Sequence, residues 1–249
     1  MKRGDLALAL AGLLVVWELV AWLARVNVLP GPWPVAVALV HALPNGLAWH
    51  FLVSGWRVAV SVVLAMVTAV PLGLALGQSR LLGRLFAPVV YILYPIPKIV
   101  FLPVILILMG IGNVSKVFMI YLVLFFQILV VVRDAAGNLR PELLYSVRSL
   151  GAGRRALFRF VYLPATVPAA LTALRVSVGT AIAVLFFAET FATTSGLGYY
   201  TMVESWSRLA YPEMYAGVVA MSVLGLLLYF IIDGFERRLA PWLFLEEKT

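Results

Sequence analysis

Five ionisable residues interrupt otherwise apolar stretches of this sequence, and they are the first candidates for chemistry. In chain order they are Glu18, Arg57, Lys98, Arg175 and Glu189. A charge among apolar residues is costly to bury, so such residues usually mark a solute path or a structural ion pair. Lys98 lies near the middle of its stretch, beside Pro95 and Pro97, where its ammonium reaches the surface less easily than at an end.

These residues have alternative interpretations. Lys98 either compensates an anion in transit or forms a structural pair with Glu189 or with a backbone carbonyl. Arg175 either lines a solute path or links its helix to the basic loop before it. We expect Glu18 to be a tolerated or snorkelling residue of a peripheral helix, and Arg57 to snorkel to lipid headgroups. Glu189 precedes a glycine-containing loop that ends in two tyrosines, which is either an outer gate or an ordinary surface loop.

Small and polar residues line one face of the stretch that holds Arg175. They are Ala169, Ala173, Ser177 and Ala181, with Thr172, Val176 and Thr180 beside them. Such a face suits either a close helix contact or the wall of a polar path. The candidate path residues are Lys98, Thr172, Arg175, Ser177, Thr180 and Glu189.

A second stripe of small residues predicts helix packing. Its members are Ala65, Ala69, Gly73 and Gly77, at intervals of four. Small residues let helices approach closely, so the stripe favours packing within the chain, with a subunit interface as the alternative.

The composition places these residues in a membrane. Hydrophobic residues make up 63% of the 249 residues and charged residues 12%, which excludes a soluble enzyme, a disordered chain and a nucleic-acid module. There is no cysteine, and the two histidines are nine residues apart, so we expect no metal site. The phosphate-binding pattern G-x-x-x-x-G-K-[ST] is not matched, which predicts that this chain does not hydrolyse ATP.

Six apolar segments are long enough to cross a bilayer as helices. They are Leu6–Leu23, Val58–Gly77, Leu85–Met109, Val117–Val132, Leu163–Ala188 and Met214–Ile232. Thirteen of the 19 Lys and Arg residues, Lys2 and Lys248 among them, fall on one side of this six-span arrangement and three on the other. Positive residues concentrate in cytoplasmic loops, which predicts that both termini are cytoplasmic.

The long basic loop from Arg133 to Tyr162 is predicted to form two short helices. Leucine and valine recur every three or four residues from Leu143 to Leu150, which is the period of a one-faced helix. Gly151 and Gly153 end this pattern, and a second basic turn follows them. Two interpretations remain: a helical element that docks on a partner, or an interfacial helix on anionic lipid.

Several motifs in order resemble the permease subunits of binding-protein-dependent ABC importers, in particular the nitrate/sulfonate/taurine subfamily. They are PIPKIVFLPVILILMGIG at 95–112, RSLGAG at 148–153, LPATVP at 163–168, AETFATTSGLGYY at 188–200 and ERRLAPW at 236–242. The loop resembles the EAA loop of that family. Tyr145, Ser146 and Val147 stand where the family has Glu-Ala-Ala, so the resemblance does not extend to the glutamate that pairs with the ATPase.

The resemblance implies an all-α fold with six transmembrane helices, the type I ABC importer (MetI-like) permease fold, as one domain over residues 1–249 with the EAA loop at about 134–164. It implies a multi-pass protein of the bacterial inner membrane, a second copy of the chain as a homodimer, two ATPase subunits that hold ATP and Mg, and an external substrate-binding protein. It assigns coupling to the ATPase to Tyr145, Arg148, Leu150, Gly151, Ala152, Arg154, Arg155 and Phe158. It suggests a small anionic solute.

Two other classes of function compete with a permease subunit. A stand-alone secondary transporter or channel would need no ATPase, but no clear repeat relates the first three spans to the last three. A non-transporting membrane scaffold would leave Lys98 and Arg175 without a role.

Overall fold

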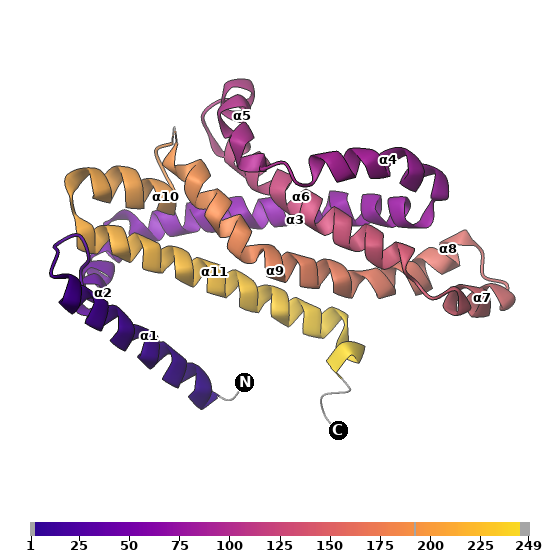
Figure 1. Ribbon diagram of the computed structural model, residues 1–249, viewed down its shortest axis with the longest axis horizontal. Helices are drawn as coiled ribbons and strands as arrows, with labels where there is room; N and C mark the ends of the chain where they lie inside the picture. The colour runs from indigo at the N-terminus through magenta and orange to yellow at the C-terminus, as the bar shows by residue number, and fades with distance from the viewer. Residues whose placement is uncertain (1–2, 192, 245–249) are drawn as a thin grey trace. The chain divides into compact units, whose positions relative to one another are not determined.

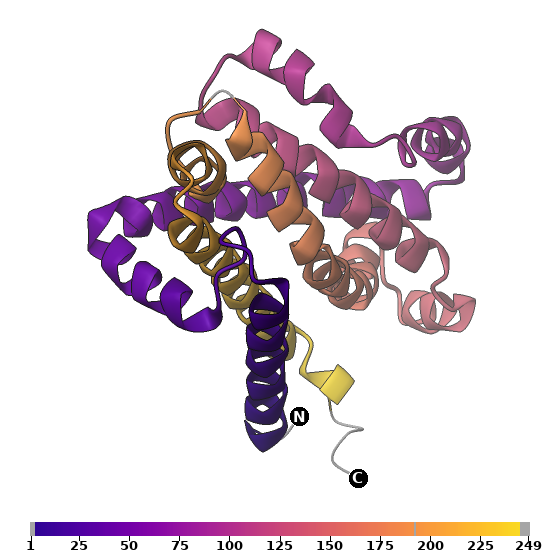
Figure 2. The ribbon, with the colours of Figure 1, turned by 60° about the vertical axis from the view of Figure 1, so that its left-hand side comes forward.

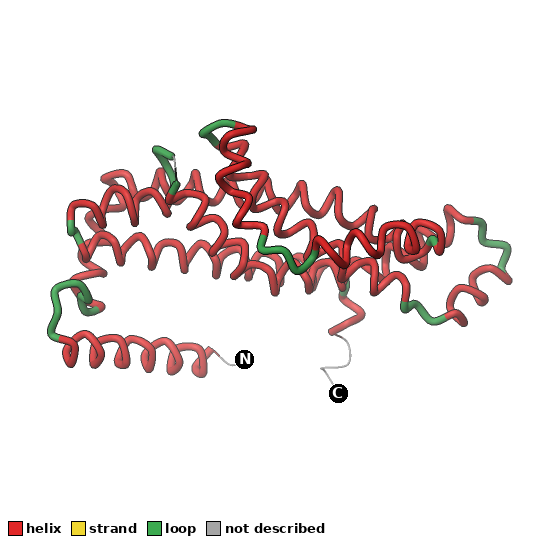
Figure 3. The backbone as a smooth tube through the Cα atoms, turned by 45° about the horizontal axis from the view of Figure 1, so that its top comes forward, coloured by secondary structure: helices red, strands yellow, loops and turns green. Residues whose placement is uncertain are grey.

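A computed structural model describes residues 3–191 and 193–244 (Figure 1). Every regular element in these ranges is a helix, as Figure 3 shows, which confirms the predicted all-α class. Lys2 and Lys248, which contribute to the charge count above, lie outside the described residues. The chain groups into two compact units, one of residues 1–55 and 186–224 and one of residues 56–185 and 225–249.

Five described helical segments are long and apolar enough to span a membrane, and a bent helix pair makes a sixth. These segments are Ala7–Ala24, Pro32–Gln78, Asn113–Gly137, Arg155–Thr190 and Tyr211–Leu239, with Arg80–Leu93 and Lys98–Met109 as the pair. The count agrees with the six spans predicted from hydropathy. The bounds differ most for Val58–Gly77, which lies within the longer helical segment Pro32–Gln78.

The first unit begins with α1 (Arg3–Ala24), which lies at the periphery. None of its apolar stretch is buried, and Glu18 is exposed, as expected for a peripheral helix. The Trp17 indole anchors α1 by donating to the Pro30 carbonyl (3.0 Å) and by lying against Tyr215.

Hydropathy missed one helix, α2 (Pro32–Ala42), because eleven residues are too few to read as a span. A π-helical turn with a kink at Gly46 joins it to α3 (Ala48–Gln78). The unit is completed by the end of α9 (Leu163–Thr190), by α10 (Leu197–Tyr199) with the helical turns that follow to Arg208, and by the start of α11 (Tyr211–Leu239).

The second unit is built on α3 and α6 (Asn113–Gly137), which pack closely along the predicted small-residue stripe. A Cβ atom at Gly73 would lie 2.9 Å from the Val132 side chain, and one at Gly77 would lie 2.5 Å from the Arg133 carbonyl oxygen. The Ser61 hydroxyl lies 3.0 Å from the Val117 carbonyl oxygen. The prediction of internal packing is therefore confirmed.

The third predicted span is two helices rather than one. After α4 (Arg80–Leu93), the chain breaks at Tyr94–Pro97, and a 3₁₀ turn at Lys98–Phe101 leads into α5 (Leu102–Met109). The two arms are bent by 79°, and Figures 1 and 2 show the chain turning sharply between them. Pro95 and Pro97 lack the N–H groups that a continuous helix would need here. Pro71 leaves α3 unbroken.

The basic loop folds as predicted, into a helix, a glycine bend and a second helix. α7 (Pro141–Ser149) is followed by Leu150 and then by Gly151, whose φ is +79°. The Gly151 N–H donates to the Arg148 carbonyl (2.9 Å) and the Ala152 N–H to the Val147 carbonyl (3.3 Å), which is the Schellman pattern of a helix end. α8 (Arg154–Leu157) follows, and a π-helical turn at Phe158–Tyr162 continues into α9 (Leu163–Thr190).

The last long helix is α11 (Tyr211–Leu239), followed by a 3₁₀ turn at Pro241–Phe244. Its first half belongs to the first unit and its second half to the second unit.

Candidate functional site

The proposed coupling residues form an exposed tip on a buried base. Leu150 is 85% exposed and Tyr145 66% exposed, and Phe158 and Arg155 are also exposed. Leu157 is buried, and beneath it lies a cavity of about 460 Å³ that Arg148 and the end of α3 help to line. The side chain of Arg154 lies outside the described residues. A rigid base with apolar side chains at its tip is a geometry suited to docking on a partner protein.

Lys98 holds the broken span together. Its ammonium donates to the carbonyl oxygens of Leu93 (2.9 Å) and Tyr94 (2.5 Å), at the end of α4 where the helical hydrogen bonding stops. The same ammonium lies 4.7 Å from the ring centroid of Phe126. A backbone carbonyl, one of the structural partners predicted for Lys98, is therefore present.

Lys98 also lines a cavity of about 320 Å³. The other polar groups of its wall are the Tyr94 and Thr180 hydroxyls and the Gln127 amide, whose buried oxygen has no hydrogen-bond partner. The remaining wall is apolar and comes from Ile96, Pro97, Ile99, Val123, Phe126 and Val184. Two of the six predicted path residues, Lys98 and Thr180, thus meet at one cavity.

Arg175 belongs to a cluster of charges that the sequence did not predict. Its guanidinium lies 3.0 Å from a carboxylate oxygen of Asp233 and 3.0 Å from one of Glu236, both on α11. The Thr172 hydroxyl donates to the other oxygen of Glu236 (2.8 Å). Of the two alternatives given for Arg175, a link to the basic loop is not among its contacts, because the guanidinium pairs with the carboxylates of α11.

The remaining predicted residues lie elsewhere. Ser177 is buried and donates to the Ala173 carbonyl one turn back (2.7 Å).

Arg57 does not snorkel. It is 2% exposed, and both Nε (2.9 Å) and an Nη atom (2.8 Å) donate to the Asn113 amide oxygen. A buried guanidinium needs hydrogen-bond acceptors, and Asn113, the first residue of α6, supplies one.

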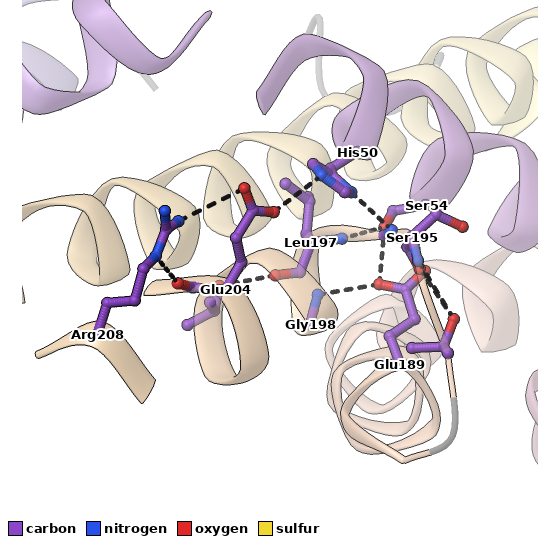
Figure 4. A network of polar contacts seen from close by, with 11 residues as sticks. His50, Ser54, Glu189, Ser195, Leu197, Gly198, Glu204 and Arg208 are labelled. Atoms are coloured by element: carbon purple, nitrogen blue, oxygen red, sulfur yellow. Dashed lines mark hydrogen bonds and ion pairs between the residues drawn. The ribbon is translucent and has the colours of Figure 1, made fainter. Parts of the chain in front are cut away.

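Glu189 is fully buried in the first unit, in a network of polar contacts (Figure 4). Its carboxylate accepts hydrogen bonds from the Ser54 hydroxyl (2.8 Å) and from the Gly198 N–H (3.0 Å). Ser54 Oγ in turn accepts from the Leu197 N–H (2.8 Å). The start of α10 is thus tied to α3 and to the end of α9.

His50 completes this network, although the sequence analysis did not predict a role for it. Its Nδ1 accepts from the Gly196 N–H (3.0 Å), and its Nε2 lies 3.3 Å from a carboxylate oxygen of Glu204. Sequence signals existed for some of the missed residues. His50 and Ser54 are four apart on one helix face, and Asp233 and Glu236 are three apart at the end of a span.

These features define the class of the protein: a helical membrane protein with several spans, one of them broken, and an exposed two-helix tip. Comparisons with known proteins identify the family. Residues 69–244 match the model for the binding-protein-dependent transport system inner membrane component. The chain belongs to this family. It is therefore a permease subunit of an ABC importer, a multi-pass protein of the inner membrane, and family membership decides against the stand-alone transporter, the channel and the scaffold.

Individual relatives support this assignment over most of the chain. The taurine transport system permease protein TauC of Escherichia coli K12 is 33% identical over 242 residues, covering 94% of this chain and 87% of TauC. The nitrate import permease protein NrtB of Leptolyngbya laminosa is 24% identical, covering 94% and 87%. A chain of the MetNI methionine ABC transporter superposes with a TM-score of 0.64 at 22% identity, covering 79% of this chain and 95% of that one. This likeness confirms the MetI-like fold.

The cluster around Arg175 predicts a difference between two arginine variants. Arg175→Met leaves Glu236, whose side chain is 3% exposed, with a buried charge and no cation, and should lower the free energy of unfolding by about 3 kcal/mol. Arg237→Met removes an exposed partner of Asp233 and should cost less than about 1 kcal/mol. Denaturant unfolding of the purified chain in detergent measures both.

A double variant tests the cause of that loss. Glu236→Gln removes the charge that Arg175→Met leaves unpaired, so the double variant should recover part of the lost stability. Equal losses for the Arg175 and Arg237 variants, or no recovery in the double variant, would contradict a buried ion pair.

Proposed function

We propose that this permease imports a small anion, of the sulfonate or nitrate kind, which passes next to the Lys98 ammonium. The observation that carries the proposal is the cation at the wall of a cavity in a broken membrane span. TauC and NrtB, whose names refer to taurine and nitrate, support the choice of solute, because taurine carries a sulfonate and nitrate is an anion.

The local chemistry of Lys98 fits a weak and transient contact. An ammonium has three N–H donors, and two of them are used by the Leu93 and Tyr94 carbonyls. Carbonyls hold the ammonium without neutralising it, so its charge remains available to an anion. The Thr180 hydroxyl lines the same cavity and is a second donor. Passage requires that binding be weak enough for release, and one cation with one hydroxyl meets that need better than a closed cage of donors.

Lys98→Met tests this role in uptake. The variant should assemble with its partners and keep basal ATPase activity, while uptake of the anion falls at least about tenfold, in line with the loss of one charge-assisted contact. Lys98→Arg retains the charge and should keep most of the uptake. Thermal unfolding of each variant separates this role from the structural one.

Two results would contradict the role of Lys98 in the path. Normal uptake by Lys98→Met would show that the solute does not need this cation. Loss of assembly in both Lys98 variants would show that Lys98 only caps the helix break.

Coupling to ATP hydrolysis is the second part of the proposal. Members of this family work with ATPase and binding-protein partners. We propose that two copies of this chain form a homodimer that binds two ATPase subunits. ATP and Mg are bound by the ATPase subunits and not by this chain. The exposed tip at Tyr145, Leu150 and Phe158 is the docking element, and Arg148, Gly151, Ala152, Arg154 and Arg155 shape it or flank it.

Gly151→Val tests the coupling role. A β-branched residue at φ +79° is strained by about 1–3 kcal/mol, so the end of α7 should shift. Membrane insertion should persist, while the ATPase activity stimulated by the loaded binding protein falls severalfold. Gly153→Val is the matched control, since a Cβ has open space at both positions but only Gly151 has a positive φ. Equal stimulation in both variants would contradict the role of the bend.

The orientation follows from the positive residues. We propose that both termini and the segment α7–α8 are cytoplasmic, and that the residues after Glu189 lie outside. The sequence contains no cysteine, so a single introduced thiol reports its own side. Ala152→Cys should react with an impermeant maleimide only from the cytoplasm, and Thr194→Cys, at an exposed position, only from outside. Reaction of both from one side would overturn the orientation.

A further inference from the structure

Three consecutive backbone N–H groups begin the segment after Glu189, and each has a side-chain acceptor. The Gly196 N–H donates to His50 Nδ1, the Leu197 N–H to Ser54 Oγ, and the Gly198 N–H to Glu189. These are the free donors at the start of the helical segment from α10 to Arg208, and a helix start needs such acceptors when it is buried. Two of the three come from one face of α3, and the third from the last turn of α9.

The backbone fits this arrangement closely. Gly196 has φ +114°, and a Cβ atom there would lie 2.3 Å from the Glu189 carboxylate. A Cβ at Gly198 would lie 2.6 Å from the Phe186 carbonyl oxygen. The segment therefore approaches the end of α9 in a way that only glycine permits, and the three acceptors hold it in that position.

Of the three acceptors, the imidazole is the one whose ordinary pKa lies near neutral pH. A neutral imidazole has one acceptor and one donor nitrogen, and here Nδ1 must be the acceptor because it faces an N–H group. The imidazole proton is therefore on Nε2, directed at Glu204, 3.3 Å away. An imidazolium has N–H on both nitrogens, and its Nδ1–H would point at the Gly196 N–H.

The surroundings of His50 set opposing influences on its protonation. Glu204 favours the imidazolium, but Arg208 pairs with Glu204 at 3.5 Å and weakens that influence. The buried Glu189 carboxylate, joined to Ser54, also favours a positive charge nearby. Burial of His50, which is 8% exposed, and the facing Gly196 N–H oppose it.

Two tyrosine rings complete these surroundings. Tyr199 and Tyr200 lie 5.8 and 5.7 Å from the imidazole, centroid to centroid. Burial raises the pKa of the Tyr200 hydroxyl, with Glu213 and Glu204 adding to that effect, so the hydroxyl stays neutral and adds no charge beside His50.

We propose that His50 is a proton-binding site that releases the segment from Gly196 to Arg208. Above the imidazole pKa, the neutral ring caps the Gly196 N–H and the segment is held against α3 and α9. As the pH falls through that pKa, a proton from solvent binds Nδ1, the Gly196 N–H loses its acceptor, and the start of the segment loosens. The ion pair of the imidazolium with Glu204 remains, so the segment loosens at one end and stays tethered at the other.

Hydrogen exchange tests this proposal without relying on transport. The full chain, in lipid nanodiscs with its ATPase partner, is compared between about pH 8 and pH 5, with rates corrected for the intrinsic pH dependence of exchange. Peptides that cover 194–205 should lose protection about three- to tenfold at low pH, the range expected for one lost hydrogen bond. Peptides from α6 should change little.

His50→Asn and His41→Asn are the matched variants, because these are the two histidines of the chain. Asn places an amide oxygen near the position of Nδ1 and does not titrate, so His50→Asn should keep the segment protected at both pH values. His41 is exposed on α2, and His41→Asn should retain the pH-dependent loss of protection. The proposal would be overturned if His50→Asn lost as much protection at low pH as the native chain. It would also be overturned if the native chain lost no protection at low pH.

Glu204→Gln provides a second measurement if His50→Asn is generally destabilised. Without the carboxylate, the imidazolium loses its stabilising partner, so the midpoint of the loss should move to lower pH. An unchanged midpoint would overturn the proposal. Both readouts are independent of the solute and of coupling to ATP, so they succeed or fail separately from the proposed function.

Discussion

A backbone that leaves a helix within a membrane must find partners for its polar groups, and the rest of this structure depends on how that requirement is met. At the bend between α4 and α5, the Lys98 ammonium binds the Leu93 and Tyr94 carbonyls at the end of α4. At the start of the segment after Glu189, three side chains bind three freed N–H groups. The end of α4 exposes carbonyl oxygens and is satisfied by a donor, the Lys98 ammonium. The start of α10 exposes N–H groups and is satisfied by acceptors. The candidate solute contact and the proposed proton site are both located at these breaks.

The sequence predicted the helical class, the number of spans and the helix–glycine–helix segment, because these depend on local patterns. Hydropathy period, proline and glycine are read directly, and Gly151 takes the positive φ expected of a helix stop. The sequence also predicted that the Gly73 and Gly77 stripe packs within the chain. The short helix α2 was missed, because its eleven residues are apolar but fall below the length of a span.

Partner choice for the charged residues could not be predicted in the same way. Arg57 pairs with Asn113, Arg175 with Asp233 and Glu236, and His50 with Gly196 and Glu204. These partners are separated by more than fifty residues in sequence, and no local period relates them. Hydropathy also treats Asp233 and Glu236 as the polar end of a span, although Glu236 is buried. The site was therefore predictable in its residue types and not in its contacts.

The close contact between α3 and α6 restricts where movement can occur. Where Gly77 meets the Arg133 carbonyl, backbone approaches backbone, and no side chain lies between the helices that could change rotamer to allow sliding. Arg57 and Asn113 fix the same pair elsewhere along its length. The two helices therefore behave mechanically as one rigid body. Any rearrangement within this unit during a transport cycle therefore has to be taken up by elements other than this helix pair.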